Sequence, residues 1–529
     1  MDDRWPVLVG VGEITQRDGV LDAAGLMRSA LGTARADAGP ALAPPDLVLV
    51  PRGMWRHPDP GRAAALACGS PAVRSVIAEI GILQQTLFSR AFTAVASGES
   101  AVCAVIGAED RYRTIRGGVE EPGDGAPDEV LRPAAEIIAR MEVERGLGVP
   151  AHQYALIESV LAHRAGRSPS EQTAAIAALW AQGATAAAAR AHESGAENGP
   201  SGDQIPPQNL GERGGAWRTD APSADAIAGE EDGNRWIATP YRKWLVSDWN
   251  VDQAAALLIT SAGAARAAGI PEDRWVVPVA AAESNHMVTV SARADPGRSP
   301  AMEAIGDALA AAGAPVESAE LRELYSCFPA AVQVQAAALG LDPWQGWTVT
   351  GGMTFGGGPL NNFVLQATAV MAQALRGGQG RTGVVTCVSG MITKVGATAW
   401  RRAGEAAPGW RSGDGSVADL AIDVTGEAER RTGVRPLDPD LAGELAIVAH
   451  TVVHRSPPKR GFDLSTAAGA ESHGPGGGSA ERAIVLAESA DGARTVVTST
   501  DERALAALTT ADHVGRRVVV GDDATFTLA

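Results

Sequence analysis

Residues 81–87, with the sequence GILQQTL, recur in modified form as residues 358–364, GPLNNFV, about 280 residues further along the chain. Each copy is followed by a predicted helix, a glycine-containing turn, a short apolar strand and another glycine. The first copy leads to the strand AVCAVI at 101–106, and the second leads to TGVVTCV at 382–388. This self-similarity predicts two related halves built on one plan. Chance similarity between two helix starts that carry glycine is the alternative.

Around the repeat, short apolar runs alternate with alanine-rich helical stretches through the first 400 residues. This alternation is typical of an α/β fold. The predicted strands are 6–11, 47–50, 101–106, 275–281 and 382–388, and the predicted helices include 23–36 and 301–312. Nearly continuous apolar strands between helices fit a parallel sheet that is covered on both faces.

The last part of the chain has a different texture. Its runs are short, and several are rich in β-branched residues, which favour strands. The predicted strands are 445–453, 482–487, 494–499, 516–520 and 525–528, with a Gly/Ser-rich stretch at 466–479. This spacing predicts a small antiparallel β-barrel, resembling an OB barrel, after the α/β body.

Two stretches rich in polar residues, glycine and proline, at 195–233 and 403–416, interrupt these patterns. We expect the first to be a long excursion and the second to be a linker between domains. The expected domains are an N-terminal half at 1–265 with a loop region at about 110–240, a C-terminal half at 266–402, the linker at 403–416, and the barrel at 417–529.

Composition excludes several classes of function. The 529 residues include 45 Lys+Arg and 62 Asp+Glu, giving a net charge of −17, which argues against nucleic acid as a partner. No apolar run is long enough for a membrane span, and the start MDDRW lacks the features of a secretory signal. Four cysteines without C-x-x-C spacing indicate neither a disulfide framework nor a zinc site, and we expect no metal. The expected location is the cytoplasm.

Several segments resemble segments of the thiolase superfamily, in the same order. They are PVLVGVG at 6–12, AVASGE at 94–99 with VIGAE at 105–109, NVDQAAA at 250–256, the glycine-rich stretch at 351–359, and TCVSG at 386–390. LYSCFP at 324–329 resembles the sterol-carrier type, and HQYALIE at 152–158 resembles the thiolase-like proteins of type 1, often labelled acetyl-CoA acetyltransferases. The resemblance covers residues 6 to about 400 and implies a thiolase fold of two related α/β halves.

The resemblance also implies a chemistry. Thiolases make or break a carbon–carbon bond next to a thioester, using a nucleophilic cysteine at a helix start, a histidine that activates it, and a second cysteine that moves a proton. Counting back from Gly98, the nucleophile position falls on Gly81, and the histidine position falls on Gly358. Only the second cysteine is matched, by Cys387. Ordinary thiolysis or Claisen condensation is therefore doubtful, because a nucleophile and its base act as a unit.

The remaining candidates for catalysis are Cys387, Tyr325, Cys327 and His286. The two cysteines are possible nucleophiles, the phenol is a possible donor to a thioester oxygen, and the imidazole could transfer a proton; each also fits a purely structural role. Expected substrate-binding positions are Gly81, Ser326, Gly357, Gly358, Ser389 and Gly390. The helix starts at Gly81 and Gly358 would offer N–H groups, and these two glycines would leave enlarged space for an acyl group.

Three functions stay open. The protein is expected to bind acyl-CoA without ordinary condensation, or to be an active acetyl-CoA acetyltransferase using Cys387, or to be a non-catalytic scaffold or acyl-binding subunit that docks a partner enzyme through the barrel. Acyl-CoA or CoA is the expected ligand, with no further cofactor required, and lipid metabolism is the expected setting. A monomer and a homodimer both stay open.

Overall fold

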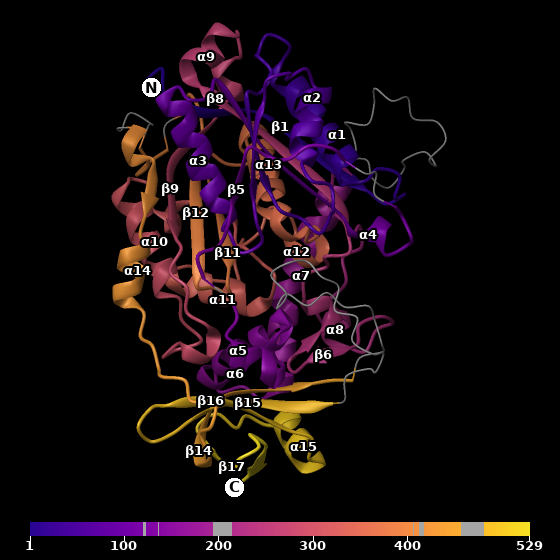
Figure 1. The fold of residues 1–529 in the computed structure, drawn as a ribbon, viewed down its shortest axis with the longest axis vertical. Helices are drawn as coiled ribbons and strands as arrows, with labels where there is room; N and C mark the ends of the chain where they lie inside the picture. Colours follow the sequence, from indigo (N-terminus) through magenta and orange to yellow (C-terminus); the bar gives the residue numbers. More distant parts are fainter. Residues whose placement is uncertain (120–122, 136, 194–213, 406, 412–416, 456–480) are drawn as a thin grey trace.

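Two β-sheets organise the protein (Figure 1). The computed structural model describes all residues except 120–122, 136, 194–213, 406, 412–416 and 456–480. The larger sheet has eleven strands, and the smaller sheet, at the bottom of Figure 1 beside the C-terminus, has seven. Helices pack on the larger sheet, so the predicted α/β body is confirmed.

The larger sheet has the strand order β10-β11-β12-β9-β1-β8-β4-β2-β3-β5, with β13 beside β9. Its strands are β1 (Pro6–Gln16), β2 (Leu47–Pro51), β3 (Arg74–Ala78), β4 (Val102–Asp110), β5 (Glu129–Leu131), β8 (Asp252–Ser261), β9 (Val276–Ser284), β10 (Leu321–Glu323), β11 (Thr382–Ser389), β12 (Lys394–Arg402) and β13 (Ala421–Asp423). All five strands predicted for the body are present, because their apolar runs are buried.

The α-helices of the described residues are α1 (Ala23–Ala38), α2 (Pro60–Ala67), α3 (Gln84–Ser97), α4 (Arg111–Thr114), α5 (Arg140–Glu142), α6 (Pro150–Arg164), α7 (Pro169–Glu193), α8 (Ala224–Ala228), α9 (Ala262–Ala267), α10 (Pro300–Ala311), α11 (Pro329–Ala338), α12 (Gly352–Phe355), α13 (Phe363–Arg376), α14 (Thr425–Arg431) and α15 (Glu502–Thr510). The two predicted helices correspond to α1 and α10.

The sheet order confirms the predicted internal repeat. In the first half, β2 runs parallel to β4, β4 antiparallel to β8, and β8 antiparallel to β1. In the second half, β10, β11, β12 and β9 repeat these relations in the same order. The helices α3 and α13, which follow the two repeated segments, each have 14 residues. The halves meet where β1 pairs with β9, at Leu8 and Val276.

Glycines in β1 let α1 pack directly against the sheet. A Cβ atom on Gly12 would lie 2.0 Å from the Ala30 carbonyl oxygen, and one on Gly10 would lie 2.3 Å from the Ala34 carbonyl oxygen. Both distances are far below contact distance, so no side chain fits at either position. The close packing of α1 therefore requires glycine at positions 10 and 12 of the PVLVGVG segment.

The outer edge of β3 is covered by β5, a short parallel strand. Side chains beside β5 hold it there: Arg62 pairs with Asp128 at 2.6 Å, and Arg90 pairs with Glu129. The Asp128 carboxylate also accepts a hydrogen bond from the Ser75 backbone N–H at 2.8 Å. The outer edge of β3 is therefore paired, and the edge strand at this end of the larger sheet is the short β5.

The smaller sheet is not the barrel predicted from the sequence. Its order is β16-β15-β14-β17-β18; β6 also pairs with β14, and β7 pairs with β6. Its strands are β6 (Trp236–Ala238), β7 (Tyr241–Arg242), β14 (Gly443–Val453), β15 (Arg482–Glu488), β16 (Arg494–Ser499), β17 (Arg517–Val520) and β18 (Phe526–Leu528). A closed barrel would need β16 and β18, the two end strands, to pair with each other. Among the described residues, only an isolated bridge between Thr498 and Thr525 joins this region.

Both faces of the smaller sheet are covered by other elements, which explains why it need not close on itself. Ile484 and Leu486 on one face belong to the main hydrophobic core, while Val485 on the other face packs in a second core with Leu508 of α15. An OB-like barrel is therefore wrong. The five strands were predicted correctly, but β6, β7 and α15 were not predicted.

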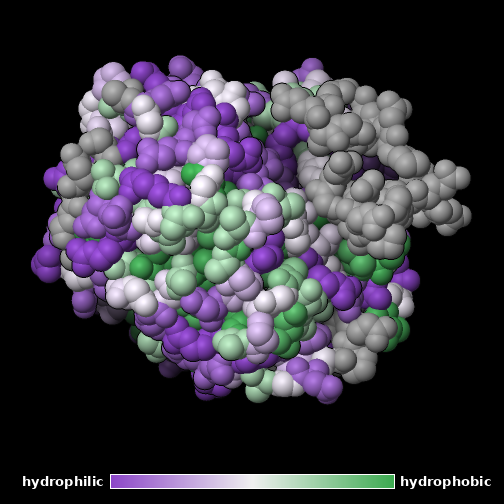
Figure 2. Space-filling model, turned by 90° about the horizontal axis from the view of Figure 1, so that it is seen from above, coloured by the Kyte–Doolittle hydropathy of each residue, from purple (hydrophilic) through white to green (hydrophobic). Residues whose placement is uncertain are grey.

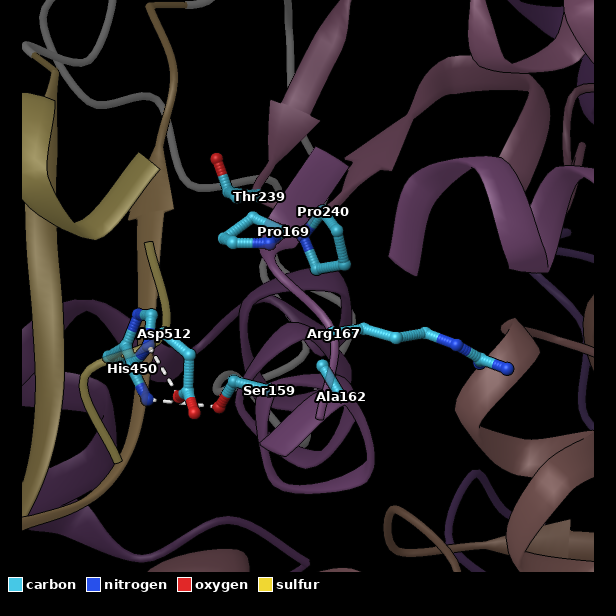
Figure 3. A pocket seen from close by; sticks show the side chains of 8 residues that line it. All are labelled: Ser159, Ala162, Arg167, Pro169, Thr239, Pro240, His450 and Asp512. Atoms are coloured by element: carbon cyan, nitrogen blue, oxygen red, sulfur yellow. Dashed lines mark hydrogen bonds and ion pairs between the residues drawn. The ribbon is translucent and has the colours of Figure 1, made fainter. Parts of the chain in front are cut away.

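Helix α6 joins the body to the smaller sheet (Figure 3). His163 Nδ1 lies 2.6 Å from Asp512 Oδ2, and the His450 backbone N–H donates to Ser159 Oγ at 3.0 Å. Figure 3 shows the small hollow beside this contact, with His450, Asp512 and Ser159 gathered on one side. These contacts fix the sheet to the helix.

The opposite end of the molecule carries α1, α2 and α9 (Figure 1), and Figure 2 looks onto it. Apolar residues gather in the middle of this face, bordered by hydrophilic ones. Leu66 of α2 is 49% exposed.

Among the residues that the structure describes, no helix has the length and apolar character needed to span a membrane.

We expect Gly12→Ala to lower the free energy of unfolding by about 2–3 kcal/mol, because the new methyl group would overlap the α1 backbone. Gly32→Ala is the matched control, since Gly32 is an exposed residue of α1 with open space around it. That variant should be more stable by about 0.5–1 kcal/mol. Urea unfolding followed by circular dichroism measures both. Equal stability of Gly12→Ala and the wild type would contradict the packing described.

We expect acid to lower the free energy of unfolding through His152 in α6. Burial lowers the pKa of His152 to about 4, although its Nδ1 lies 2.8 Å from the Gly146 carbonyl oxygen. The unfolded chain takes up this proton near its ordinary value of 6.5, so stability is full above that pH and is lost as the pH falls towards 4. The loss is up to about 3 kcal/mol. In His152→Gln, unfolding measured between pH 7 and 4.5 should depend less on pH; an unchanged slope would refute this role.

Candidate functional site

The candidate site lies where the first turn of α3 meets the larger sheet. Glu283, Gly396 and Cys387 are paired across β9, β12 and β11, so they form one row on one face. A Cβ atom on Gly396 would lie 2.6 Å from Gln85 Cβ. The first turn of α3 therefore rests directly on Gly396, which no other residue type would allow.

The other half repeats this arrangement. Gly107, Ala255 and Glu13 form the equivalent row across β4, β8 and β1. A Cβ atom on Gly107 would lie 2.8 Å from Asn362 Oδ1, just before α13. The repeat thus extends from sequence to packing, but a glycine occupies the place that a thiol occupies in the second half.

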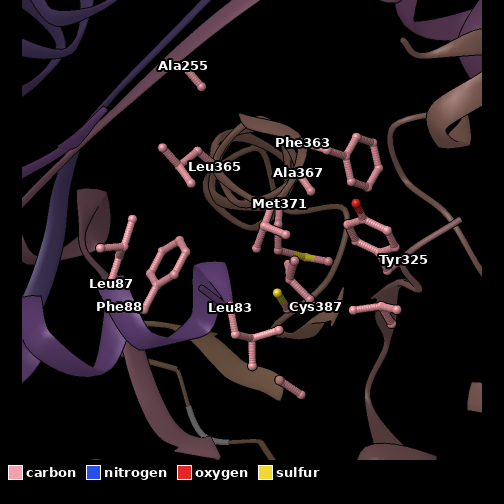
Figure 4. Close-up of a cluster of buried hydrophobic side chains, with 14 of the residues drawn as sticks. Leu83, Leu87, Phe88, Ala255, Tyr325, Phe363, Leu365, Ala367, Met371 and Cys387 are labelled. Carbon is pink, nitrogen blue, oxygen red and sulfur yellow. The ribbon is translucent and has the colours of Figure 1, made fainter. Parts of the chain in front are cut away.

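Cys387 lies fully buried under the first turn of α3 (Figure 4). Its thiol donates to Gln84 Oε1 at 2.9 Å. Burial raises the pKa of this thiol to about 12, although backbone N–H groups of Gln85 and Gln84 favour the thiolate. The thiol is therefore protonated at neutral pH and is a poor nucleophile in this structure.

The N-terminal ends of α3 and α13 contact each other through Gln84, the first residue of α3, and Asn361, two residues before α13. Gln84 Nε2 donates to Asn361 Oδ1 at 2.7 Å, and Asn361 Nδ2 donates to the Arg52 carbonyl oxygen at 2.7 Å. Gln84 and Asn361 occupy the same position in the two copies of the repeat. A continuous chain of hydrogen bonds thus runs from the Cys387 thiol, through both tips, to the residue that follows β2.

Gly81 does not face open space. Its φ is +100°, a conformation that favours glycine, and a Cβ atom would lie 3.2 Å from Pro133 Cγ. The Gly81 carbonyl oxygen accepts a hydrogen bond from Lys394 Nζ. Lys394 is itself buried, and this burial lowers its pKa, while Cys387 and Glu283 favour its charged form. A buried amine therefore fixes the backbone at the expected nucleophile position.

Gly358 is enclosed as well. A Cβ atom there would lie 3.0 Å from the Met353 carbonyl oxygen and 3.2 Å from the Asp248 carbonyl oxygen. Beside it, Gly357 has φ +105°, and a Cβ atom would lie only 2.1 Å from Gln253 Oε1. The expectation that two glycines leave enlarged space is therefore wrong at these positions, because neighbouring backbone and side chains fill it.

Two loop segments cover the glycine-rich stretch. The Trp217 N–H donates to the Gly356 carbonyl oxygen at 3.0 Å, and the Arg218 N–H donates to the Phe355 carbonyl oxygen at 2.8 Å. From the second segment, the Asp248 N–H donates to the Met353 carbonyl oxygen at 3.0 Å. The Gly358 N–H, which was expected to face a ligand, donates instead to the Asp248 carbonyl oxygen at 2.9 Å, so this donor is bonded within the chain itself.

Tyr325, Ser326 and Cys327 lie on the neighbouring loop before α11. Tyr325 packs edge-to-face against Phe363 at 5.6 Å; burial raises the pKa of its phenol, and the thiols of Cys327 and Cys387 act in the same direction. Ser326 Oγ accepts a hydrogen bond from the Met353 N–H at 3.0 Å. Cys327 is half-buried, but burial of its thiol raises the pKa to about 12. The structure thus brings Tyr325 near both thiols.

The last candidates follow the ends of β9 and β11. His286 is half-buried, and its Nε2 has no hydrogen-bond partner among the described residues. Ser389 pairs with Lys394 across the strands, and the Gly390 carbonyl oxygen accepts from Arg293 at 3.0 Å. No hydrogen bond within the described ranges joins His286 to Cys387.

Sequence reasoning missed Gln84, Asn361, Lys394 and Glu283 as members of this site. The signal for the first two was present, since the repeat places carboxamides at equivalent positions. Lys394 is one of three lysines in the chain, but nothing in its own neighbourhood indicates burial. In the described part of the chain, no three His, Cys, Asp or Glu side chains are grouped so that they could hold a metal ion.

No protein-family model matches the chain, and no curated protein matches it significantly. Its structure is similar to a monomeric SCP2-thiolase like protein type 1 from Mycobacterium smegmatis, with a TM-score of 0.74 and 24% identity over 100% of both chains. It is also similar to an acetyl-CoA acetyltransferase from Syntrophomonas wolfei, with a TM-score of 0.51 and 16% identity over 75% of this chain and 98% of that chain. These similarities confirm the predicted thiolase-like fold.

The sequence alone suggests that Gly81→Cys with Gly358→His could partly restore thiolysis. The structure reverses this expectation, because both new side chains would meet occupied space and residue 81 would be strained. We expect no turnover of acetoacetyl-CoA and a loss of about 2–4 kcal/mol in unfolding free energy. Urea unfolding and a thiolysis assay measure this, with each single variant as a control. Restored thiolysis would show that the two tips open in solution.

Proposed function

We propose that this thiolase-fold protein binds CoA thioesters without carrying out cysteine–histidine condensation chemistry. The absence of condensation chemistry is inferred from the Cys387 thiol. This thiol is buried, is hydrogen-bonded to the Gln84 carboxamide, and has its pKa raised by burial to about 12. At pH 7, only about one such thiol in 10⁵ would be ionised. Gly81 and Gly358 supply neither a nucleophile nor a base.

Ligand binding is supported by the fold and by two half-buried pairs of guanidinium and indole groups. The fold is similar to that of a protein described as an acetyl-CoA acetyltransferase. Arg218, which also pairs with Asp220 at 2.8 Å, lies over Trp244 at 4.5 Å, and Arg111 of α4 lies over Trp249 at 5.3 Å. Guanidinium and indole groups of this kind suit phosphates and purine rings. No further cofactor is part of the proposal.

Arg242, which lies two residues before Trp244, is not part of the proposed ligand site. Arg242 is buried, stacks on Trp236 at 4.0 Å and pairs with Glu230 at 3.1 Å. It therefore serves the local fold, whereas we assign Trp244 to the ligand site.

A monomer in the cytoplasm, acting in lipid metabolism, completes the proposal. The pairing of β3 with β5 supports the monomeric state, because only the three-residue edge of β5 is left at this end of the sheet to pair with a second copy. The similar protein from Mycobacterium smegmatis is described as monomeric.

Incubation with acetyl-CoA separates this proposal from the two alternatives. We expect saturable binding in calorimetry, no acetyl adduct in intact-mass analysis, and no thiolysis of acetoacetyl-CoA. An adduct on Cys387 would instead support an active acyltransferase. Absence of any affinity for CoA or acetyl-CoA would overturn the proposal and favour a scaffold that docks a partner enzyme through its C-terminal sheet.

We expect Cys387→Ala to bind CoA with an affinity within about twofold of the wild type, because the thiol is covered by the first turn of α3. Any residual acyl-group chemistry should disappear in this variant. Cys68→Ala, at a half-buried cysteine on another part of the chain, is the control. Retained acyl transfer in Cys387→Ala would remove this thiol from the site.

A further inference from the structure

The chain of hydrogen bonds at the two helix tips runs from the interior towards the surface. Cys387 is completely buried and Gln84 is 3% exposed, whereas Asn361 is half-buried. Arg52, whose carbonyl oxygen accepts the last hydrogen bond, is also half-buried. The hydrogen-bonded groups therefore lie between the buried thiol and the half-buried residues Asn361 and Arg52 at their outer end.

These hydrogen bonds join the two halves of the fold. Gln84 belongs to α3 in the first half, and Asn361 precedes α13 in the second half. Cys387 belongs to β11 of the second half, so the Gln84 side chain is held on both sides by groups from the other half. Its amide oxygen accepts from the thiol and its amide nitrogen donates to Asn361, which uses both ends of one carboxamide.

The remaining contacts of this turn of α3 do not depend on that carboxamide. Thr86 Oγ1 donates to Glu283, Thr398 Oγ1 donates to Gln85 Oε1 at 3.0 Å, and Lys394 holds the Gly81 carbonyl oxygen. The backbone of the tip would thus stay in place if the bridge from Gln84 to Asn361 were broken. Only the covering of the thiol would change.

We propose that the Gln84–Asn361 contact is a latch that closes the path to Cys387. When it opens, the thiol faces the path beneath the backbone N–H groups of the first turn of α3. The inference rests on the proposed function only for the group that opening admits, which is the acyl end of a CoA thioester. It assigns a gating role to two carboxamides that occupy one position of an internal repeat.

The test is the rate at which N-ethylmaleimide modifies Cys387, followed by peptide mass spectrometry so that the other cysteines do not interfere. Asn361→Ala decides the matter, because Asn361 belongs to the latch without touching the thiol. We expect its Cys387 to react about five- to tenfold faster than in the wild type, as for the loss of one buried hydrogen bond. Gln84→Ala should do the same, and the double variant should add little to either change.

Asn362→Ala is the matched control. Asn362 is the neighbouring carboxamide, it is buried, and its side-chain polar atoms have no hydrogen-bond partner among the described residues. Its Cys387 should react at the wild-type rate. Circular dichroism confirms that each variant is folded, and Asn361→Ala alone decides the test if Gln84→Ala does not fold. Equal rates in Asn361→Ala and Asn362→Ala would overturn the latch.

Acetyl-CoA separates failure of the latch from failure of the proposed function. If both are right, acetyl-CoA slows the modification of Cys387 in Asn361→Ala. Faster modification that acetyl-CoA does not slow, with no binding in calorimetry, would support the latch and refute the proposed ligand. Binding of acetyl-CoA to the wild type with equal rates in the two asparagine variants would refute the latch alone.

Discussion

The close approach of α3 to the sheet at Gly396 is the constraint on which the site depends. A helix can lie this near a strand only where the strand carries no side chain, and Gly396 meets that condition. The approach sets the first turn of α3 over Cys387 and brings Gln84 to Asn361 of the other half. In the other half, Asn362 lies over Gly107, which is the counterpart of Cys387 and not of Gly396, so the two halves share the row of paired residues but differ in which position carries the glycine.

Much of the fold could be predicted from the sequence, because burial of apolar strands leaves a direct pattern. The five strands of the body, α1, α10 and the two related halves follow from apolar runs and from the repeat at 81–87 and 358–364. The barrel was wrong because strand spacing does not say what covers each face of a sheet. Strands β6 and β7 were missed because they have only three and two residues and are separated by Thr239 and Pro240.

The site was harder to predict, because a missing side chain says nothing about what replaces it. The resemblance led us to expect the missing thiolase groups at Gly81 and Gly358, but the sequence does not show that Pro133 and Met353 fill the space beside these glycines. A buried polar group needs a partner, and Gln84 satisfies the Cys387 thiol. That pairing joins residues about 300 positions apart, which only the tertiary fold brings together.

The strand β6 bears on whether the smaller sheet is an independent domain. It pairs with β14 at Ala238 and Val453, so a sheet made mostly from the last ninety residues takes a strand from a much earlier loop. Apolar residues of this sheet also continue the core of the body. The C-terminal segment is therefore not a structurally independent domain. Removal of this segment would leave β6 without its partner β14 and would expose part of the core of the body to solvent.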